Sequence, residues 1–421
     1  MHLRIAVGVA VAILSVPLVL TSLFVFGGPA LQSELARLPF LGPAATYFVQ
    51  SITVEQLRAG YHAPTDPLTG TVPYSTKPGR IRILIMPGHE PDYGGTEFRG
   101  IFERDVVVDL AEDLAELLAQ NPRYEVIIAR TTTAWHPTLV EYFASRWGDI
   151  VAFSKTQKQI TNAHYESGAL VEKSDKIHHN NAREDIALRL YGINKWAAEN
   201  NIALTLHLHI NDYPRRQDRV GEYDGFSIYV PDYQYSTSQA SKAVGEALAS
   251  RLRAFRPESS LPKEGGGVVE TQELIAAGSN NTLDNAGMLI EYGYIYEPQF
   301  LDASTRALAL RDYAYQTYLG LQDFFGDPVQ GTYGSGALPF VWSDRPLAGK
   351  TTPDIYALQS ALRYLGHYPP AGKSLTECPI SGYFGACTGL SLKAFQRAHN
   401  LAPSGVFDQK TKVALTQVFI P

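Results

Sequence analysis

Four residues suited to metal binding or acid–base chemistry follow one another along the chain: His89, Glu103, His209 and Glu291. His89 ends the short apolar stretch "IRILIMPGH", and Glu103 opens the amphipathic stretch "ERDVVVDLAEDLAELLAQ". His209 and Glu291 lie in two further apolar stretches, "IALTLHLHI" and "GMLIEYGYI". Domains of the α/β class keep their sites at the carboxyl ends of parallel strands. We therefore expect the four side chains to meet at one edge of a sheet.

Two histidines and two glutamates are a set with a known use in hydrolysis. Zinc in hydrolytic sites commonly has three protein ligands, such as two imidazoles and one carboxylate, and keeps a fourth position for water. Binding lowers the pKa of that water to about 7. A second carboxylate, not on the metal, can then move the proton to a leaving amine. Glu291 is the candidate for this role, because an apolar strand would desolvate its carboxyl group and raise its pKa. The residues alone thus predict metal-assisted amide hydrolysis.

A further histidine, His207, stands two residues before His209 in "NIALTLHLHIND", residues 201–212. Side chains two apart on a strand share a face and lie about 6.6 to 7 Å apart. The pair could flank one metal ion or one buried polar site, and the spacing does not decide between the two.

The elements that must position these residues follow an α/β rhythm from 81 to 326. Short apolar strands alternate with amphipathic helices, which predicts one domain around a mainly parallel sheet flanked by helices. The strands are expected at 81–89, 124–130, 202–210, 223–230 and 287–295, and the helices at 103–120, 186–200, 236–255 and 307–325.

Two long segments interrupt this rhythm, residues 135–182 and residues 257–285. Segments of this length inside a compact domain are usually functional or mobile. The second is rich in Gly and Asn and is expected to be a loop. The first is a polar insertion, and we expect four of its side chains to lie on the surface: His164, Glu166, His178 and His179.

Three blocks of the sequence resemble those of zinc-dependent N-acetylmuramoyl-L-alanine amidases: "MPGHEPDYGGTEFRGIFERD", "LHLHIND" and "MLIEYGYIYEPQFL". The resemblance makes His89, Glu103 and His209 the ligands of Zn²⁺, and Glu291 the general base and acid. His207 stands at a serine position of the family and is expected beside the metal rather than on it. The resemblance implies a cell-wall hydrolase that cleaves the amide between N-acetylmuramic acid and L-alanine of the peptidoglycan stem peptide.

The sequence departs from that family pattern at three places. Met86 replaces an aspartate that could hydrogen-bond to a ligand imidazole. Glu90 and Pro91 replace two glycines, which adds a carboxylate close to the metal. The insertion at 135–182 is longer than in a minimal member. In some relatives an inserted helix covers the active site until a partner pulls it away, so we expect this insertion to restrict access and an activator protein to be a candidate partner.

Residues 353–421 form a second, all-α unit behind a linker at 327–352. Three helices are expected, in "PDIYALQSALRYLG", "TGLSLKAFQRAHN" and "FDQKTKVALTQVF". With its "LQSALRYLGHY" and "GYFGACTGLSLKAFQRAHNL" stretches, the unit resembles the small helical peptidoglycan-binding domain. The resemblance implies that peptidoglycan is a binding partner.

The chain has only two cysteines, Cys378 and Cys387, and both lie in this unit. Such scarce, paired use in an exported chain favours one short disulfide, worth about 2 to 4 kcal/mol. Two unrelated buried thiols are the alternative. A zinc site is not expected there, because no histidine or further cysteine stands at ligand spacing.

The N-terminus carries an apolar run without charges from Ile5 to Phe26, preceded by Arg4. The run is about long enough to cross a bilayer as a helix and longer than the core of a signal peptide. We predict a transmembrane signal anchor over residues 1–27, with a cleaved signal and a secreted protein, or a buried core helix, as alternatives. The positive-inside rule places the remainder outside the cytoplasm, in the cell envelope. Residues 28–80, rich in Pro, Gly and Thr, are expected to be a stalk with little regular structure.

Composition narrows the remaining functions. A net charge of -6 provides no basic face, which excludes nucleic acid as a partner. Two functions stay open beside the amidase. One is a zinc peptidase acting on stem peptides, although the sequence contains no His-Glu-x-x-His motif. The other is a catalytically inactive wall-binding protein that has kept the fold.

Overall fold

The computed structural model describes residues 53–58, 65–66, 70–71, 80–174, 182–213, 218–279, 285–327 and 349–419. Within these residues, no helix combines the length and the apolar character that a membrane crossing requires. The predicted anchor at 1–27 lies outside the described residues, as do His178 and His179.

A six-stranded sheet forms the centre of the larger domain, in the strand order β6-β3-β7-β10-β8-β9. The strands are β3 (Ile81–Pro87), β6 (Tyr124–Ile128), β7 (Leu204–Asn211), β8 (Ser227–Pro231), β9 (Val268–Thr271) and β10 (Ala286–Tyr294). Every neighbouring pair is parallel except β8 and β10, which are antiparallel. The predicted α/β fold with flanking helices is confirmed, and the single antiparallel pair makes the sheet mixed.

Helices cover both faces of this sheet. On one face, α5 (Glu103–Leu118), α8 (Ser238–Phe255) and α10 (Ala303–Phe325) share the main hydrophobic core with Ile83 and Ile85 of β3. On the other face, Leu84 and Met86 of the same strand pack with residues of α7 (Glu184–Glu199). Side chains alternate along a strand, so a strand buried on both faces is apolar throughout. This explains the apolar run from Ile83 to Pro87 in β3.

Five short elements lie where the sequence predicts loop or stalk. Strand β9 and a 3₁₀ helix, η1 (Pro262–Glu264), fall inside the segment 257–285. The four residues of β9 are too few to show a period of their own, and they pair only along the edge of the sheet. In the predicted stalk, α4 (Val54–Arg58) buries Leu57 completely in the main core. Two-residue strands β1 (Thr65–Asp66) and β2 (Gly70–Thr71) pair antiparallel in the same region.

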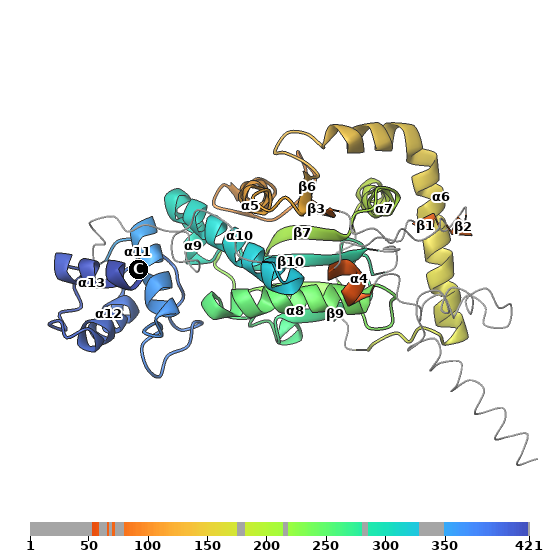
Figure 1. The fold of residues 1–421 in the computed structure, drawn as a ribbon. Helices are drawn as coiled ribbons and strands as arrows, with labels where there is room; N and C mark the ends of the chain where they lie inside the picture. The colour runs from red at the N-terminus through yellow and green to blue at the C-terminus, as the bar shows by residue number, and fades with distance from the viewer. Residues whose placement is uncertain are drawn as a thin grey trace, which may run out of the picture.

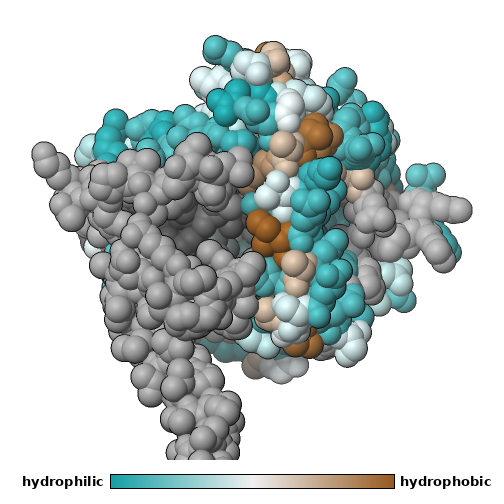
Figure 2. Space-filling model, turned by 90° about the vertical axis from the view of Figure 1, so that its right-hand side faces the viewer, coloured by the Kyte–Doolittle hydropathy of each residue, from teal (hydrophilic) through white to brown (hydrophobic). Residues whose placement is uncertain are grey.

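The insertion is mainly one long helix, α6 (Pro137–Ser167), with a kink at Arg146. Phe153, Gln157, Thr161 and His164 are buried along one face of it at spacings of three or four residues. The prediction that His164 lies on the surface is therefore wrong, because the segment is a helix with a packed face rather than a solvated loop. Glu166 is exposed, as predicted. Figure 2 views the molecule from the side on which Figure 1 places α6, and the described residues visible on this face are mainly hydrophilic with isolated hydrophobic ones.

The C-terminal unit forms the three predicted helices, α11 (Pro353–Tyr364), α12 (Ala386–Ala398) and α13 (Gln409–Phe419). It lies at the end of the molecule opposite α6 (Figure 1). Helix α11 packs on α10 and α8, and Tyr356 of α11 is completely buried there. The Tyr356 hydroxyl donates a hydrogen bond to Asp312 Oδ2 at 3.0 Å. The two domains therefore share a packed and polar seam.

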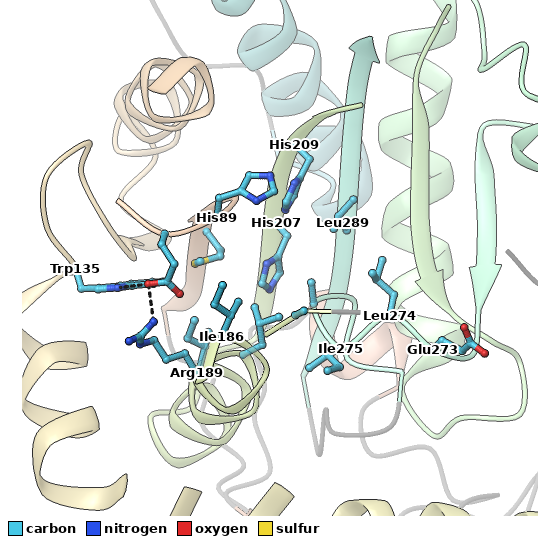
Figure 3. A pocket seen from close by; sticks show the side chains of 16 residues that line it. His89, Trp135, Ile186, Arg189, His207, His209, Glu273, Leu274, Ile275 and Leu289 are labelled. Atoms are coloured by element: carbon cyan, nitrogen blue, oxygen red, sulfur yellow. Dashed lines mark hydrogen bonds and ion pairs between the residues drawn. The ribbon is translucent and has the colours of Figure 1, made fainter. Parts of the chain in front are cut away.

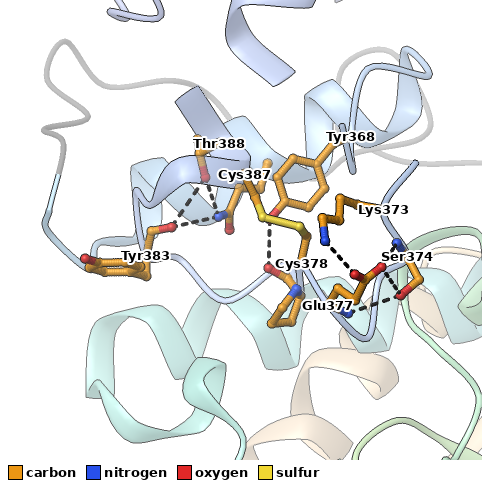
Figure 4. Close-up of a disulfide and its surroundings, with 10 residues drawn as sticks. Tyr368, Lys373, Ser374, Glu377, Cys378, Tyr383, Cys387 and Thr388 are labelled. Carbon is orange, nitrogen blue, oxygen red and sulfur yellow. Dashed lines mark hydrogen bonds and ion pairs between the residues drawn. A yellow bond between two sulfur atoms is a disulfide. The ribbon is translucent and has the colours of Figure 1, made fainter. Parts of the chain in front are cut away.

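The predicted disulfide joins Cys378 to Cys387 (Figure 4). It links the loop after α11 to the first turn of α12. Within that loop, Lys373 forms an ion pair with Glu377 at 2.7 Å, and the Tyr368 hydroxyl donates to the carbonyl of Pro379 at 2.9 Å. The disulfide and these local bonds hold a long loop whose Tyr368, Ile380 and Phe384 side chains are buried in the core.

Candidate metal centre

The structure brings three of the predicted site residues together at the carboxyl edge of the sheet. His89 follows β3, Glu103 is the first residue of α5, and His209 lies near the end of β7. One ligand atom from each lies within 4.8 Å of the others. Glu103 Oε2 is 2.9 Å from His89 Nε2, and Glu103 Oε1 is 2.9 Å from His209 Nδ1. Three side chains separated by 120 residues of sequence thus form one compact group of nitrogen and oxygen donors.

The turn that carries His89 depends on close approach of the backbone. A Cβ atom on Gly88 would lie only 2.4 Å from Cε1 of His209, so a larger residue would displace the His209 ring. His89 itself has a φ of 69°, which is uncommon for a residue other than glycine. The two imidazole rings meet edge to face, with centroids 4.8 Å apart. The Pro-Gly-His sequence therefore places one ring against the other.

Glu103 is held in a fixed orientation at the start of its helix. Its Oε2 accepts a hydrogen bond from the Thr96 backbone N–H at 2.9 Å, and its Oε1 accepts one from the Ile210 N–H at 3.1 Å. Burial by itself would raise the pKa of Glu103, but the charge of His89 and the hydrogen bonds with both histidines outweigh it and hold the pKa well below its ordinary value. The carboxylate is therefore ionised over the physiological range.

The two histidines of β7 have different surroundings. Burial lowers the pKa of His209 despite its bond to Glu103, so the ring is neutral. His207 is almost completely buried, and burial together with His209 lowers its pKa to about 3. His207 Nε2 has no hydrogen-bond partner among the described residues, and it is not part of the group of donors around Glu103. The structure thus places His207 beside the group, one step along the same face of the strand.

Glu291 lies opposite His209 in the parallel pairing of β10 with β7. Residues paired in register point to the same face of the sheet, so its carboxyl lies on the side of the candidate ligands. Burial raises the pKa of Glu291 well above its ordinary value, and the charges of Glu103 and Glu264 raise it further. Its Oε2 is buried without a hydrogen-bond partner among the described residues. A buried carboxyl of this kind is suited to holding and passing a proton.

Glu264 is a carboxylate near Glu291 that the sequence analysis does not single out. It lies in η1, inside the segment 257–285, and is buried. Several hydroxyl groups donate hydrogen bonds to it. The Ser259 hydroxyl donates at 2.5 Å, the Tyr294 hydroxyl at 3.1 Å, and the Tyr229 hydroxyl also donates to it. Three small signs mark the position in the sequence, namely an acidic residue, a preceding proline and a following run of glycines, but they are too common to identify it.

A cavity of about 260 Å³ adjoins this group (Figure 3). His89, His207 and His209 line one side, and α7 and the segment after β9 line the other, mostly with apolar side chains, which include Ile186, Leu190, Ile193, Leu274 and Ile275. Of the insertion, Trp135 and Ala182 line the cavity, and these are residues near its two ends. The body of α6 is not among the lining residues.

Glu90, one of the departures from the family pattern, has partners of its own at this cavity. Its Oε2 accepts a hydrogen bond from Trp135 Nε1 at 3.1 Å and forms an ion pair with Arg189 at 3.0 Å (Figure 3). Glu90 is not part of the ligand group around Glu103. Met86, another of the departures, is buried in the core under α7. The extra carboxylate is therefore used to hold the wall of the cavity.

A sheet edge that carries two histidines and a glutamate within coordination distance, next to a buried glutamate, is typical of metal-dependent hydrolases. The model of the N-acetylmuramoyl-L-alanine amidase family matches residues 83–323, and a peptidoglycan binding domain model matches residues 351–415. The first match covers more than half of the 421 residues, and the chain belongs to this amidase family. It is a cell-wall hydrolase that cleaves the bond between N-acetylmuramic acid and L-alanine in peptidoglycan, and it acts outside the cytoplasm.

Solved structures similar to this chain include three amidases. The CwlD amidase from Clostridioides difficile, in complex with the GerS lipoprotein, is 14% identical over 58% of this chain and 98% of its own, with a TM-score of 0.39. Ami1 from Mycobacterium smegmatis is 13% identical over 59% and 98%, with a TM-score of 0.38. The catalytic domain of CwlV from Bacillus (Paenibacillus) polymyxa var. colistinus is 13% identical over 59% and 99%, with a TM-score of 0.35. No curated protein matches the chain by sequence.

Proposed function

We propose that the amidase reaction requires a Zn²⁺ ion held by His89, Glu103 and His209. The observation that carries the proposal is the convergence of one donor atom from each within 4.8 Å. The donor set suits the ion, because His209 is neutral and Glu103 is ionised. When bound, the ion would act as a Lewis acid toward the scissile carbonyl and would activate water.

In this proposal Glu291 is the general base and then the general acid. Its position opposite His209 supports the role, since neighbouring strands are only about 4.8 Å apart. Glu291 takes a proton from water as the water oxygen bonds to the carbonyl carbon of the lactyl group. The bond between that carbon and the nitrogen of L-alanine then breaks, and Glu291 gives the proton to the nitrogen. The products are a carboxylate on the glycan and a free amino group on the peptide.

The cavity beside His207 would receive substrate groups next to the scissile amide. Apolar walls with few polar groups are typical of binding pockets, because the walls exclude water and the polar groups orient the ligand. His207, neutral and without a partner for Nε2 among the described residues, can offer one hydrogen bond there. The ion pair of Glu90 with Arg189 keeps the opposite wall in place.

The domain order supports an envelope enzyme that is held at the membrane. The apolar run behind Arg4 would anchor residues 1–27, and residues 28–80 would connect the anchor to a catalytic domain at 81–326. A linker at 327–352 would lead to a peptidoglycan-binding domain at 353–421, which directs the enzyme to the wall.

Two measurements on the purified full-length protein test this proposal. Elemental analysis should find about one zinc per chain, lost on chelation together with wall lysis and regained with added Zn²⁺. Mass spectrometry of digested wall fragments should find intact glycan and peptides that begin with L-alanine. A metal-free protein with full activity would refute the zinc proposal. Cleavage within the stem peptide would instead indicate the peptidase.

A further inference from the structure

Arg130 is a buried charged residue next to the candidate metal centre, and no role has yet been given to it. It stands two residues after the end of β6, in the stretch "YEVIIAR", and only 1% of its surface is exposed. Burial lowers its pKa to about 10, so the guanidinium remains charged at neutral pH. A buried charge persists in a folded protein only where hydrogen bonds replace the lost water.

The replacement bonds of Arg130 go to backbone carbonyls. Nε donates to the carbonyl of Pro87 at 3.1 Å, and Nη2 donates to the carbonyl of Gly88. Nη2 also donates to the carbonyl of Arg104 at 2.9 Å, and Nη1 donates to that of Thr131 at 3.0 Å. One planar guanidinium therefore joins three separate parts of the backbone.

Two of these parts carry the candidate ligands. Pro87 and Gly88 directly precede His89, and Arg104 directly follows Glu103. The bonds thus connect the turn after β3 to the first turn of α5, on the side where the two ligand side chains approach each other. Because His89 has a left-handed backbone conformation, the structure around it must hold that turn in place.

A lysine could not make the same set of bonds. Its ammonium group is a single point with three donors, whereas the guanidinium offers five N–H groups in a rigid plane. The four carbonyls lie in three backbone segments, and they outnumber the three donors of an ammonium group. The choice of arginine at this position therefore follows from the number and the spread of the carbonyls around it.

We propose that Arg130 is a positioning residue that sets the distance between the His89 turn and the Glu103 helix start, and so tunes the affinity for the metal ion. The inference rests on the proposed zinc site. It predicts that the affinity depends on this side chain, although its hydrogen bonds go to backbone carbonyls and not to the ligand atoms.

The test compares Arg130→Lys and Arg130→Gln with Arg256→Lys in the full-length protein. Arg256 is a matched control, because it is also a buried arginine but lies at the seam between the domains. Zinc affinity is measured by competition with a chelator, the Co²⁺-substituted spectrum reports the ligand geometry, and thermal unfolding reports stability. We expect both Arg130 variants to bind zinc about 10 to 100-fold more weakly, with an altered spectrum. Arg256→Lys should unfold at a lower temperature with unchanged zinc affinity.

The outcomes separate the two proposals. If wild-type protein binds no zinc, the proposed function fails and this inference fails with it. If wild-type protein binds zinc and a folded Arg130 variant binds it equally tightly with the same spectrum, only the inference is overturned. If neither variant folds, the test uses wild-type protein labelled with ¹⁵N-arginine. Hydrogen exchange of the Arg130 Nε–H with solvent is then measured with and without zinc. Strong protection that changes on zinc addition supports the role, and rapid exchange refutes it.

Discussion

Arg130 and Arg256 are both buried arginines, but their guanidinium groups have different partners. Arg130 donates to the backbone carbonyls of Pro87 and Arg104, which lie beside the candidate metal centre. Arg256 donates to the side chain of Asp312 at 2.8 Å and to the carbonyl of the adjacent Phe255 at 3.1 Å. Its guanidinium lies over the rings of Tyr313 and Tyr356, 4.9 and 5.0 Å from their centroids. The first arginine joins segments of one domain. The second joins two domains, because Tyr356 belongs to α11.

This difference reflects what each region must hold constant. A metal centre needs its ligand atoms within a fraction of an ångström, and backbone bonds fix the segments from which the ligands project. A domain seam needs only to stay closed, and side chains suffice for that. Asp312 accepts bonds from Arg256, Gln316 and Tyr356, so one carboxylate connects α8, α10 and α11. The peptidoglycan-binding domain is therefore docked on the catalytic domain as well as joined to it by the linker.

The largest effect is expected at the metal centre, from Glu291→Gln. The amide has nearly the same shape but cannot accept the proton of the attacking water, so kcat should fall by about 10² to 10⁴-fold. Zinc content and thermal stability should stay at or above those of the parent. A variant that lyses walls at the wild-type rate would remove Glu291 from the mechanism.

At the seam, Asp312→Ala should reduce stability without touching the chemistry. The change leaves Arg256 buried without its carboxylate, which typically costs about 3 to 5 kcal/mol. Denaturant unfolding of the whole chain measures the loss. Tyr356→Phe is the matched control, because it removes a single hydroxyl bond worth about 1 kcal/mol. An equal loss of unfolding free energy in the two variants, or loss of zinc from Asp312→Ala, would show that the domain seam and the candidate metal centre are not independent.

The smallest effect is a shift in pH dependence from Glu264→Gln. A negative neighbour raises the pKa of Glu291 after burial has already raised it, so removing that charge lowers the pKa. As a base, Glu291 must be ionised, and the acid limb of kcat/KM should move to lower pH. Glu258→Gln in the same segment is the control, since Glu258 pairs with Arg253 near the surface. An unmoved limb, or an equal shift in both variants, would exclude Glu264 from this role.

The same raised pKa has a consequence for folding in the metal-free protein. A carboxyl whose pKa is higher in the folded than in the unfolded chain stabilises the fold fully below its unfolded value, and this stability is lost as pH rises through the folded value. Bound metal would alter that balance. Metal-free protein should therefore become less stable as pH rises through the folded pKa of Glu291, and thermal unfolding across a pH series measures this.

Much of the candidate site can be listed from the sequence, because each of its residues stands in a distinctive local pattern. His89 follows Pro87 and Gly88 at the end of an apolar strand, and His209 and Glu291 interrupt two other strands. The main strands and helices can also be predicted, from the spacing of their apolar residues. Strand β9 is not predicted from the sequence, because four residues at a sheet edge are too few to show a periodic pattern. The burial of His164 is not predicted either, because a polar helix can still have a buried face.

By itself the sequence determined the order of strands and helices and the division into an α/β domain and a small helical domain. It also determined the four candidate site residues, His89, Glu103, His209 and Glu291. These follow from local physics, namely the period of apolar residues and the rigid turns of proline and glycine. Only the tertiary structure decided that Arg130 bonds the backbone beside two candidate ligands, that Glu264 lies near Glu291, and that Asp312 closes the seam. Each of those depends on groups that are far apart in the chain and become neighbours only when the core packs.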